Sequence, residues 1–205
     1  MNCLFTNNTA DEGAAIANMA DNCSPNIVNC TFSANDAGAT GGIVRNFANS
    51  TPAYTNCIFW GNASTTPNTV IVDSPPGATV TYSIVEGGYP GTGNMDIDPV
   101  FVSATDLHLE PCSPAIGRGN SSANGTTEEL DGNQRVVGLI DLGVYERATG
   151  TGTPIVWTGN GDGENWSDSA NWDLGIIPQK CHDVLIPSPH MVKIQTGMEL
   201  SLIHI

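Results

Sequence analysis

Basic residues are the scarcest chemical groups in this chain, and their spacing limits what it could catalyse. Six lysines and arginines face twenty-one aspartates and glutamates in 205 residues. A lyase that acts on uronate polymers needs carboxylates around calcium and a basic residue that takes a proton. Arg45 is the only lysine or arginine before Arg118, but Asp21 lies 24 residues before it and Asp73 lies 28 residues after it, so no acid accompanies it at a regular spacing. The sequence therefore assigns no catalytic residue.

Acidic residues could instead act in pairs or bind a cation. A glycoside hydrolase needs two carboxylates that face one groove, and no such pair recurs along the chain. Calcium prefers oxygen ligands on turns, which are offered by Asp96-Ile97-Asp98, by Asp131-Gly132-Asn133 and by residues 159–165, GNGDGEN. None of these has the layout of an EF-hand or of a calcium-binding nonapeptide repeat. We therefore expect no cofactor and no metal ligand, and calcium is the one ion that these turns could bind.

Histidine and cysteine spacing does not indicate a metal site either. The histidines are His108, His182, His190 and His204. They lack ligand spacing and a nucleophile partner, so we interpret them as ordinary surface or cap residues. Cys3, Cys30 and Cys57 are evenly spaced, and we interpret them as stacked buried thiols, with a disulfide between neighbours as the alternative. Metal is the least favoured partner, because the chain has no CxxC or HxxxH motif.

The overall composition is that of acidic, turn-rich β structure. A net charge of −15 makes contact with the phosphate backbone of nucleic acid unfavourable. Only 13% of the residues are charged, and Asn, Ser, Thr and Gly take their place, which is typical of β structure outside the cell. The sequence shows no membrane-spanning apolar run and no signal peptide at its start. We therefore expect an extracellular or cell-surface protein with no nucleic-acid partner.

A 27-residue repeat positions these groups. The motif Asn-Cys-x-Phe-x-x-Asn occurs at residues 2–8, 29–35 and 56–62. Adding 27 once more puts Ile84 in the cysteine column and Ser83 in the asparagine column. A second apolar column consists of Ile16, Ile43 and Val70. A fixed period of this size predicts a solenoid.

Each repeat is expected to form three short strands and three corners, because Gly, Asn, Thr and β-branched residues disfavour helix. In the second repeat, the side chains of Ile27, Cys30 and Phe32 are predicted to point inward, and those of Val28 and Thr31 outward. Asn29 lies at a bend, where asparagine tolerates unusual φ/ψ and its amide can bond the same amide one coil away. The predicted fold is an all-β parallel β-helix.

The repeat also carries a family resemblance. Phe-x-x-Asn, at Phe5/Asn8 and in two later copies, alternates with Gly-Gly-Ile-Val at residues 41–44. This alternation resembles the repeats of the polymorphic outer-membrane protein family and covers residues 1–95. The resemblance implies a right-handed parallel β-helix on a surface-exposed or secreted bacterial protein associated with the outer membrane, and the general rule for parallel crossovers gives the same handedness. The third repeat departs from the family, because residues 69–73, TVIVD, lack the glycine pair.

The next stretch resembles the segment that closes many bacterial secreted β-helix proteins. Its landmarks are Asp98 to Phe101, Leu107 to Leu109, Ser113 to Ile116 and Asp141 to Glu146. We expect residues 96–147 to form the last coil or coils and a loop-rich cap, because the open end of a β-helix exposes unpaired backbone and an apolar cross-section. This resemblance does not by itself imply a catalytic activity.

A second module is predicted beyond a linker at residues 148–155. Residues 156–205 are expected to start a truncated β-rich module, in which DVLIP and MVKIQTG alternate like strands. Trp157, Trp166 and Trp172 could stack on sugar rings, although packing within the module is the simpler interpretation. Because Met1 directly precedes a repeat and the last residues resemble a strand, we expect truncation at both ends, with further coils before Met1.

These observations favour a non-catalytic scaffold with a structural, adhesive or binding role. Its expected partner is a polysaccharide or a host or cell-surface protein. The alternative is a polysaccharide lyase or glycoside hydrolase of the pectate-lyase-like β-helix type, with its catalytic coils outside these residues. A recurring acidic column in the missing coils would favour the enzyme, whereas uninterrupted Ser, Thr and Asn at outward positions would favour the binding scaffold.

Overall fold

The structure, a computed structural model, consists of two compact units, Met1–Arg147 and Ala148–Ile205. It describes residues 1–20, 22–38, 41–47, 49–64, 71–73, 77–147, 155–178, 183–194 and 202–204. Within these residues it is an all-β structure with two short 3₁₀ turns, Ser121–Ala123 and Ser169–Asn171. Each unit is described by itself below.

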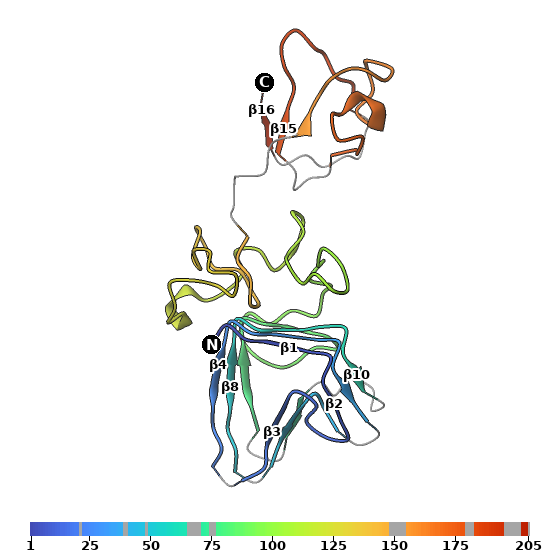
Figure 1. Cartoon of the computed structure of the whole chain (residues 1–205). Coiled ribbons are helices and arrows are strands. Elements are labelled where there is room, and N and C mark those ends of the chain that lie inside the picture. Colours follow the sequence, from blue (N-terminus) through green and yellow to red (C-terminus); the bar gives the residue numbers. More distant parts are fainter. Residues whose placement is uncertain are drawn as a thin grey trace. The chain divides into compact units, whose positions relative to one another are not determined.

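The first unit is a parallel β-solenoid with about 27 residues per turn, as predicted (Figure 1). Its strands stack into four sheets, and every pairing between neighbouring coils is parallel. The covered sheet contains β1 (Leu4–Thr6), β5 (Thr31–Ser33), β9 (Ile58–Phe59) and β13 (Ile84–Val85). The short sheet contains β2 (Thr9–Ala10), β6 (Asp36–Ala37) and β10 (Ala63–Ser64). The prediction of three strands per turn missed these two-residue strands.

Two further sheets complete the coil. The arginine sheet contains β3 (Ile16–Asn18), β7 (Val44–Asn46) and β11 (Ile71–Asp73). The hydroxyl sheet contains β4 (Asn26–Val28), β8 (Ala53–Thr55) and β12 (Thr79–Thr81). Figure 1 looks along the solenoid, so that the strands of each sheet lie one behind another.

The fourth coil is one residue shorter than the sequence predicted. Ile84 pairs with Ile58, and the backbone N–H of Cys57 donates to the Ser83 hydroxyl at 3.0 Å. Ser83, not Ile84, therefore continues the cysteine column, and Tyr82, at φ 47°, takes the place of the bend asparagine. The prediction was wrong because five residues separate β11 from β12, whereas six residues separate β7 from β8.

The second apolar column was also misplaced by one residue. Ile16 pairs with Val44, and Val44 pairs with Ile71. The link from β6 to β7 has one residue more than the link from β2 to β3, which shifts the register. Ile43 is nevertheless fully buried in the core, and Val70 lies outside the described residues.

The corner beside the covered sheet has the backbone that the asparagines suggested. Asn2, Asn29 and Asn56 have φ values of 51°, 55° and 56°, in the left-handed region that asparagine tolerates. The Asn56 side-chain amide donates to Oδ1 of Asn29 at 3.0 Å. The predicted ladder stops there, because the Asn29 amide donates to Asn124 and the Asn2 amide donates to Thr126 and to a backbone carbonyl.

A second asparagine column, at the other end of the covered sheet, forms the continuous ladder. The Asn8 amide donates to Oδ1 of Asn35 at 2.9 Å, and the Asn35 amide donates to Oδ1 of Asn62 at 3.0 Å. Asn35 and Asn62 also donate to backbone carbonyls of the preceding coil. A third pair, which the sequence did not predict, joins Asn18 to Asn46 at 2.7 Å. Asparagine amides therefore bond from coil to coil at three positions around the solenoid.

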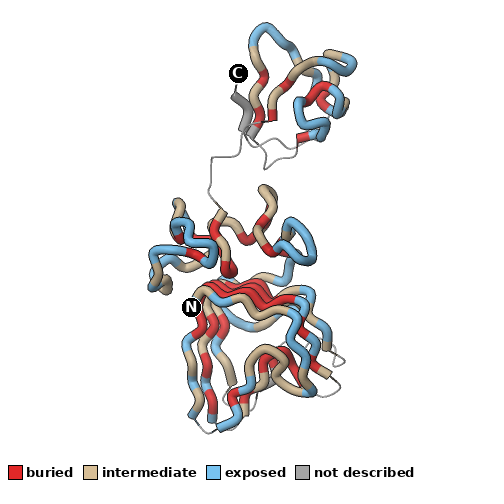
Figure 2. The backbone as a smooth tube through the Cα atoms, viewed as in Figure 1, coloured by how far each residue is buried: buried red, intermediate tan, exposed pale blue. Residues whose placement is uncertain are grey.

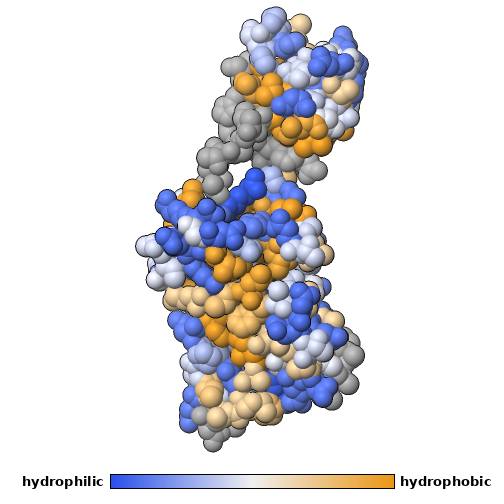
Figure 3. All heavy atoms as spheres, viewed as in Figure 1, coloured by the Kyte–Doolittle hydropathy of each residue, from blue (hydrophilic) through white to orange (hydrophobic). Residues whose placement is uncertain are grey.

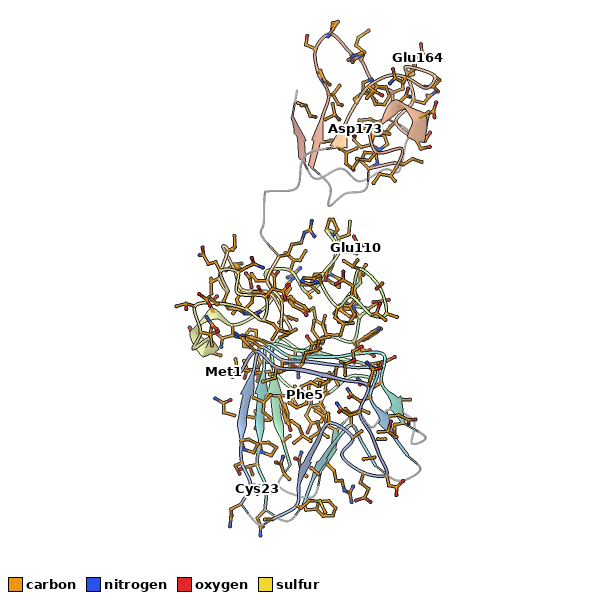
Figure 4. The ribbon with its side chains drawn as sticks, viewed as in Figure 1. Met1, Phe5, Cys23, Glu110, Glu164 and Asp173 are labelled. Carbon is orange, nitrogen blue, oxygen red and sulfur yellow. The ribbon has the colours of Figure 1, made fainter. Side chains whose placement is uncertain are left out.

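Stacked side chains fill the interior as expected. The Phe5 and Phe32 rings are parallel with centroids 4.6 Å apart, and the Phe32 and Phe59 rings are parallel at 4.3 Å. Figure 4 shows Phe5 pointing into the coil. The cysteines of the column are free thiols, which excludes the disulfide alternative, and Cys30 and Cys57 are buried whereas Cys3 is exposed. In this view along the solenoid, hydrophobic atoms gather at the centre of the coil (Figure 3).

Residues 86–96 close one end of the solenoid. Asn94 accepts from the Ser83 N–H and donates to the Val80 carbonyl, and Glu86 accepts from the Gly61 N–H. Tyr89 packs against the core. A Cβ at Gly91 would lie 1.9 Å from the Val80 carbonyl oxygen, so this turn requires glycine.

Residues 107–147 lie along a side of the solenoid, and not over its end as the sequence analysis expected. The outward side chains Ile58 and Ile84 of the covered sheet pack against Leu109, Ala115 and Leu142. We call residues 107–147 the cover. Figure 2 shows the buried band where the cover meets the sheet. Contact extends from the first coil to the fourth.

Polar contacts fix the cover in register with the coils. The Val144 N–H donates to the Thr31 hydroxyl at 3.0 Å, and the Gly143 N–H donates to the Asn56 carbonyl at 2.8 Å. Thr31 points outward as predicted but is buried, because the cover lies on it. A Cβ at Gly143, which has φ 87°, would lie 2.7 Å from that hydroxyl oxygen.

The second unit also contains a parallel sheet. Its strands are β14 (Ile155–Val156), β15 (Asp183–Leu185) and β16 (Leu202–His204), paired in chain order. The expected strand at MVKIQTG is reduced, within its described residues, to one bridge between Asn165 and Lys193. Trp157, Trp166 and Trp172 pack edge to face in the core at 2% exposure or less. They are therefore core residues, and stacking on sugars is excluded.

We expect replacement of Asn35 by alanine to destabilise the first unit. The substitution leaves the Phe5 carbonyl and the amides of Asn8 and Asn62 without their partner in a buried site, at a cost of roughly 2–4 kcal/mol. Urea unfolding measures the change. Asn26→Ala, at an exposed position on β4, is the matched control and should stay within about 0.5 kcal/mol of the parent. An unchanged midpoint for Asn35→Ala would contradict the ladder.

Candidate binding face

The outer side of the hydroxyl sheet is the most regular exposed surface of the solenoid. On its strands Ile27, Tyr54 and Val80 point inward and belong to the core. The residues on either side of them point outward because side chains alternate along a strand, and two of these, Val28 and Ala53, are apolar. We define the hydroxyl face as Ser24, Asn26, Thr51, Thr55, Thr79 and Thr81. All six are exposed or partly exposed and uncharged.

Neighbouring coils are linked across this face by their hydroxyl groups. Oγ of Ser24 lies 3.0 Å from Oγ1 of Thr51, and it also accepts from the Thr51 N–H. Oγ1 of Thr55 lies 3.3 Å from Oγ1 of Thr81. Each hydroxyl has one proton and two lone pairs, so these groups keep hydrogen-bonding capacity towards solvent.

The spacing of the face suits an extended polar chain. Parallel strands lie about 4.8 Å apart, so the hydroxyls of Ser24 and Thr51, and those of Thr55 and Thr81, come from coils one such interval apart. Hydroxyl and amide groups can both donate and accept hydrogen bonds, which matches the hydroxyl groups of a sugar polymer. The face can therefore position a neutral polar ligand, but it holds no acid or base that would cleave one.

Arg45, the candidate base of a lyase, is engaged on the arginine sheet. Its guanidinium carbon lies 4.7 Å from the centroid of the Phe47 ring, and its Nε lies 3.9 Å from a carboxylate oxygen of Glu12. Its neighbours in register on the adjacent strands are Ala17 and Val72. The arrangement is an ion pair with a cation–π contact.

The acids considered with Arg45 do not form a catalytic group with it. Asp73 pairs with Asn46, which is the position after Arg45 on the strand, so the two residues belong to different rows. Asp21 lies outside the described residues. Neither acid lies at the repeat spacing from Arg45 in the sequence, and the strand register of Asp73 agrees with that spacing.

The predicted calcium turns use their carboxylates as acceptors for N–H groups. Asp96 accepts from the Gly87 N–H at 3.0 Å, and Asp98 accepts from the Val100 N–H at 2.8 Å. Asp131 accepts from the His108 ring. A carboxylate that accepts hydrogen bonds from nearby N–H groups stabilises the local turn. We therefore interpret these aspartates as turn-forming residues.

The GNGDGEN loop is organised in the same way around a buried asparagine. Asp162 accepts from the backbone N–H groups of Glu164 and Asn165 and from the Asn171 amide. These hydrogen bonds lower the pKa of Asp162. Asn171 is fully buried, and its Oδ1 accepts from the N–H groups of Gly161 and Gly163. Figure 4 places Glu164 on the outside of this unit.

An acid with a strongly raised pKa lies in the cover, where the sequence indicated only a closing motif. In Asp141 to Glu146 the Glu146 carboxylate is buried, accepts from the N–H groups of Val137 and Asp141, and lies 4.0 Å from Nε of the buried Arg135. Burial raises the pKa of Glu146 to about 7. The Arg135 guanidinium donates to the carbonyls of Asp141 and Gly143.

Asp141 completes this internal network. Its carboxylate accepts from the N–H groups of Gly117 and Arg147 at 2.7 Å each. The carboxylates of Asp141 and Glu146 therefore bind backbone N–H groups from other parts of the cover. In the sequence only the motif Asp-x-Gly-x-Tyr-Glu pointed to this network. Nothing in the sequence predicted that Arg135 belongs to it.

Two of the four histidines can be placed. His108 lies in the cover, with its two ring nitrogens 2.6 Å from Asp106 and 2.8 Å from Asp131. His190 is exposed in the second unit. His182 and the His204 side chain lie outside the described residues.

The part of the chain that the structure describes contains no group of three or more His, Cys, Asp or Glu side chains that could hold a metal ion. Among the same residues no helix is long and apolar enough to cross a membrane. Comparison with known proteins gives no match to a family model, a curated protein or a solved structure. The fold and the contacts above are therefore the basis for the function proposed below.

The Glu146 carboxyl predicts that the stability of the first unit depends on pH. Its pKa is about 7 in the fold against 4.5 for an ordinary glutamate, so its contribution is fully present below about pH 4.5 and is lost as pH rises towards 7. In the parent chain the free energy of unfolding should fall by about 2–3 kcal/mol over this range, and Glu146→Gln should abolish this fall. Unfolding midpoints from pH 4 to 8 measure the slope. The partly exposed control Glu110→Gln should keep it, and an unchanged slope in Glu146→Gln would disprove the assignment.

Proposed function

We propose that this chain is a non-catalytic binding scaffold of a secreted or cell-surface protein, and that the hydroxyl face binds a neutral polysaccharide. The observation that carries the proposal is the composition of that face: its six defining residues are all Ser, Thr or Asn. Ala53, between Asn26 and Thr79, and Val28, next to Thr55, complete the outward strand positions of this sheet, and none of these positions is charged.

Charge favours a neutral ligand over an acidic one. The chain has a net charge of −15, so an acidic polysaccharide would be repelled at low ionic strength. The candidate acids elsewhere are bound to N–H groups of turns or to His108, which agrees with a scaffold and gives no support to general acid–base catalysis.

The location rests on the sequence resemblances. The alternation of Phe-x-x-Asn with Gly-Gly-Ile-Val and the order of landmarks in residues 98–146 both resemble bacterial surface or secreted β-helix proteins. The parallel β-solenoid agrees with that resemblance at the level of fold. A right-handed coil and an association with the outer membrane belong to the proposal on the same grounds.

We expect removal of the Thr55 and Thr81 hydroxyls to weaken polysaccharide binding. Thr→Val conserves shape but deletes the hydroxyl, so the double variant should bind about tenfold more weakly if about two hydrogen bonds are lost. Titration calorimetry with soluble neutral polysaccharides measures the affinity. Thr9→Val, exposed on β2, is the control and should bind like the parent.

The same preparation distinguishes the enzymatic alternative. Incubation with neutral and acidic polysaccharides, with calcium and with a chelator, should release no product. Calcium-dependent unsaturated products would overturn the scaffold and support a lyase. Binding to a cell-surface protein with no affinity for any polysaccharide would keep the scaffold but refute the polysaccharide ligand.

A further inference from the structure

The His108 ring lies between two carboxylates and on an aromatic ring. Its Nδ1 is 2.6 Å from Oδ1 of Asp106, and its Nε2 is 2.8 Å from Oδ2 of Asp131. The ring stacks on Tyr145, with centroids 3.9 Å apart and an interplanar angle of 21°. We call Asp106, His108, Asp131 and Tyr145 the clasp.

The clasp joins three separate segments of the chain. His108 and Asp106 belong to a hairpin that contains the bridge between Phe101 and Leu109. Asp131 lies in the turn enclosed by the bridge between Glu128 and Gln134. Tyr145 comes from the Asp141 to Glu146 motif that folds the cover. A single imidazole therefore ties together parts of the cover that are far apart in sequence.

We propose that the clasp is a proton-operated latch, in which the doubly protonated His108 ring ties the 101–109 hairpin to the 128–134 turn over Tyr145. The chemical reason is the number of protons on the ring. An imidazolium donates from both nitrogens, whereas a neutral imidazole donates from one and presents a lone pair at the other. Loss of the proton leaves one of the two carboxylates facing a lone pair, and that side of the latch is released.

The charges around the ring favour the protonated form. Partial burial acts to lower the pKa of His108, but the hydrogen bonds to Asp106 and Asp131 outweigh it, so the pKa is raised. The hydrogen bond from His108 lowers the pKa of Asp106. A raised histidine pKa gives a contribution that is complete below about pH 6.5 and lost as pH rises through the folded-state value.

The other charged groups near the clasp act in both directions. On the turn, Glu129 is buried and accepts from the N–H groups of Asp131 and Asn133. The Arg147 guanidinium donates to the Leu109 carbonyl, next to His108 in sequence. The Tyr145 hydroxyl has a raised pKa because of burial and the nearby carboxylates, so it stays neutral while His108 titrates. Two carboxylates in direct contact outweigh one guanidinium held by a backbone carbonyl.

Nuclear magnetic resonance titration of the whole chain tests the protonation directly. The imidazole signals of His108, assigned by their loss in His108→Gln, should titrate with a pKa above the ordinary value of about 6.5. Asp131→Asn removes one carboxylate and should lower that pKa. A His108 pKa at or below about 6.5 would overturn the proposal, and so would a pKa unchanged in Asp131→Asn.

Hydrogen exchange tests whether the proton operates the latch. In the parent chain, protection of the amides in residues 128–134, corrected for intrinsic rates, should fall about fivefold as pH rises through the pKa of His108, as expected for one lost hydrogen bond. His108→Gln should abolish this step, because glutamine does not titrate. His190→Gln, exposed in the second unit, should retain it. Glu146 titrates over the same range, so all these chains also carry Glu146→Gln, and a step that persists in His108→Gln then refutes the latch.

Discussion

The solenoid depends on buried asparagine amides that find their partners one coil away. Asn35 cannot satisfy its side chain within its own coil alone, because it accepts from Asn8 and donates to Asn62. A buried amide without a partner is costly, whereas a pair in register stabilises only modestly. The ladder therefore acts mainly as a register constraint: a shift by one residue would leave amides unpaired along the whole edge and would also turn the phenylalanine stack away from the core.

The cover follows from the same constraint on the opposite edge. At the corner of Asn2, Asn29 and Asn56 the left-handed backbone directs amides towards the side of the solenoid, where a coil-to-coil ladder is incomplete. Residues of the cover supply the missing partners, such as Asn124 for Asn29. The outward Ile58 and Ile84 then require an apolar covering, which Leu109, Ala115 and Leu142 provide. The hydrogen bonds to the corner asparagines and the burial of Ile58 and Ile84 thus place the cover on this one face.

The sequence revealed the repeat but not the local shifts and not the position of the cover. Period, strand type and the phenylalanine column follow from spacing, and Phe5, Phe32 and Phe59 stack as the spacing predicted. Ile84 was misplaced because one shorter loop changes the register without changing residue types. Thr31 resembles a solvent-facing residue in any one-coil pattern, and only long-range packing buries it. The clasp could not be predicted either, because Asp106, His108, Asp131 and Tyr145 share no spacing.

Thr31 and Thr55 differ in what the cover does to them. Both are outward threonines on short strands, and each hydroxyl lies close to a partner. Thr31 accepts from the Val144 N–H and is sealed beneath the cover. Thr55 faces another hydroxyl and remains partly exposed. The cover therefore uses the hydrogen-bonding groups of one side, and the corner of Asn29 and Asn56 joins that side to the adjacent hydroxyl sheet. The hydroxyl sheet, which the cover leaves exposed, can therefore present hydroxyl groups at fixed positions.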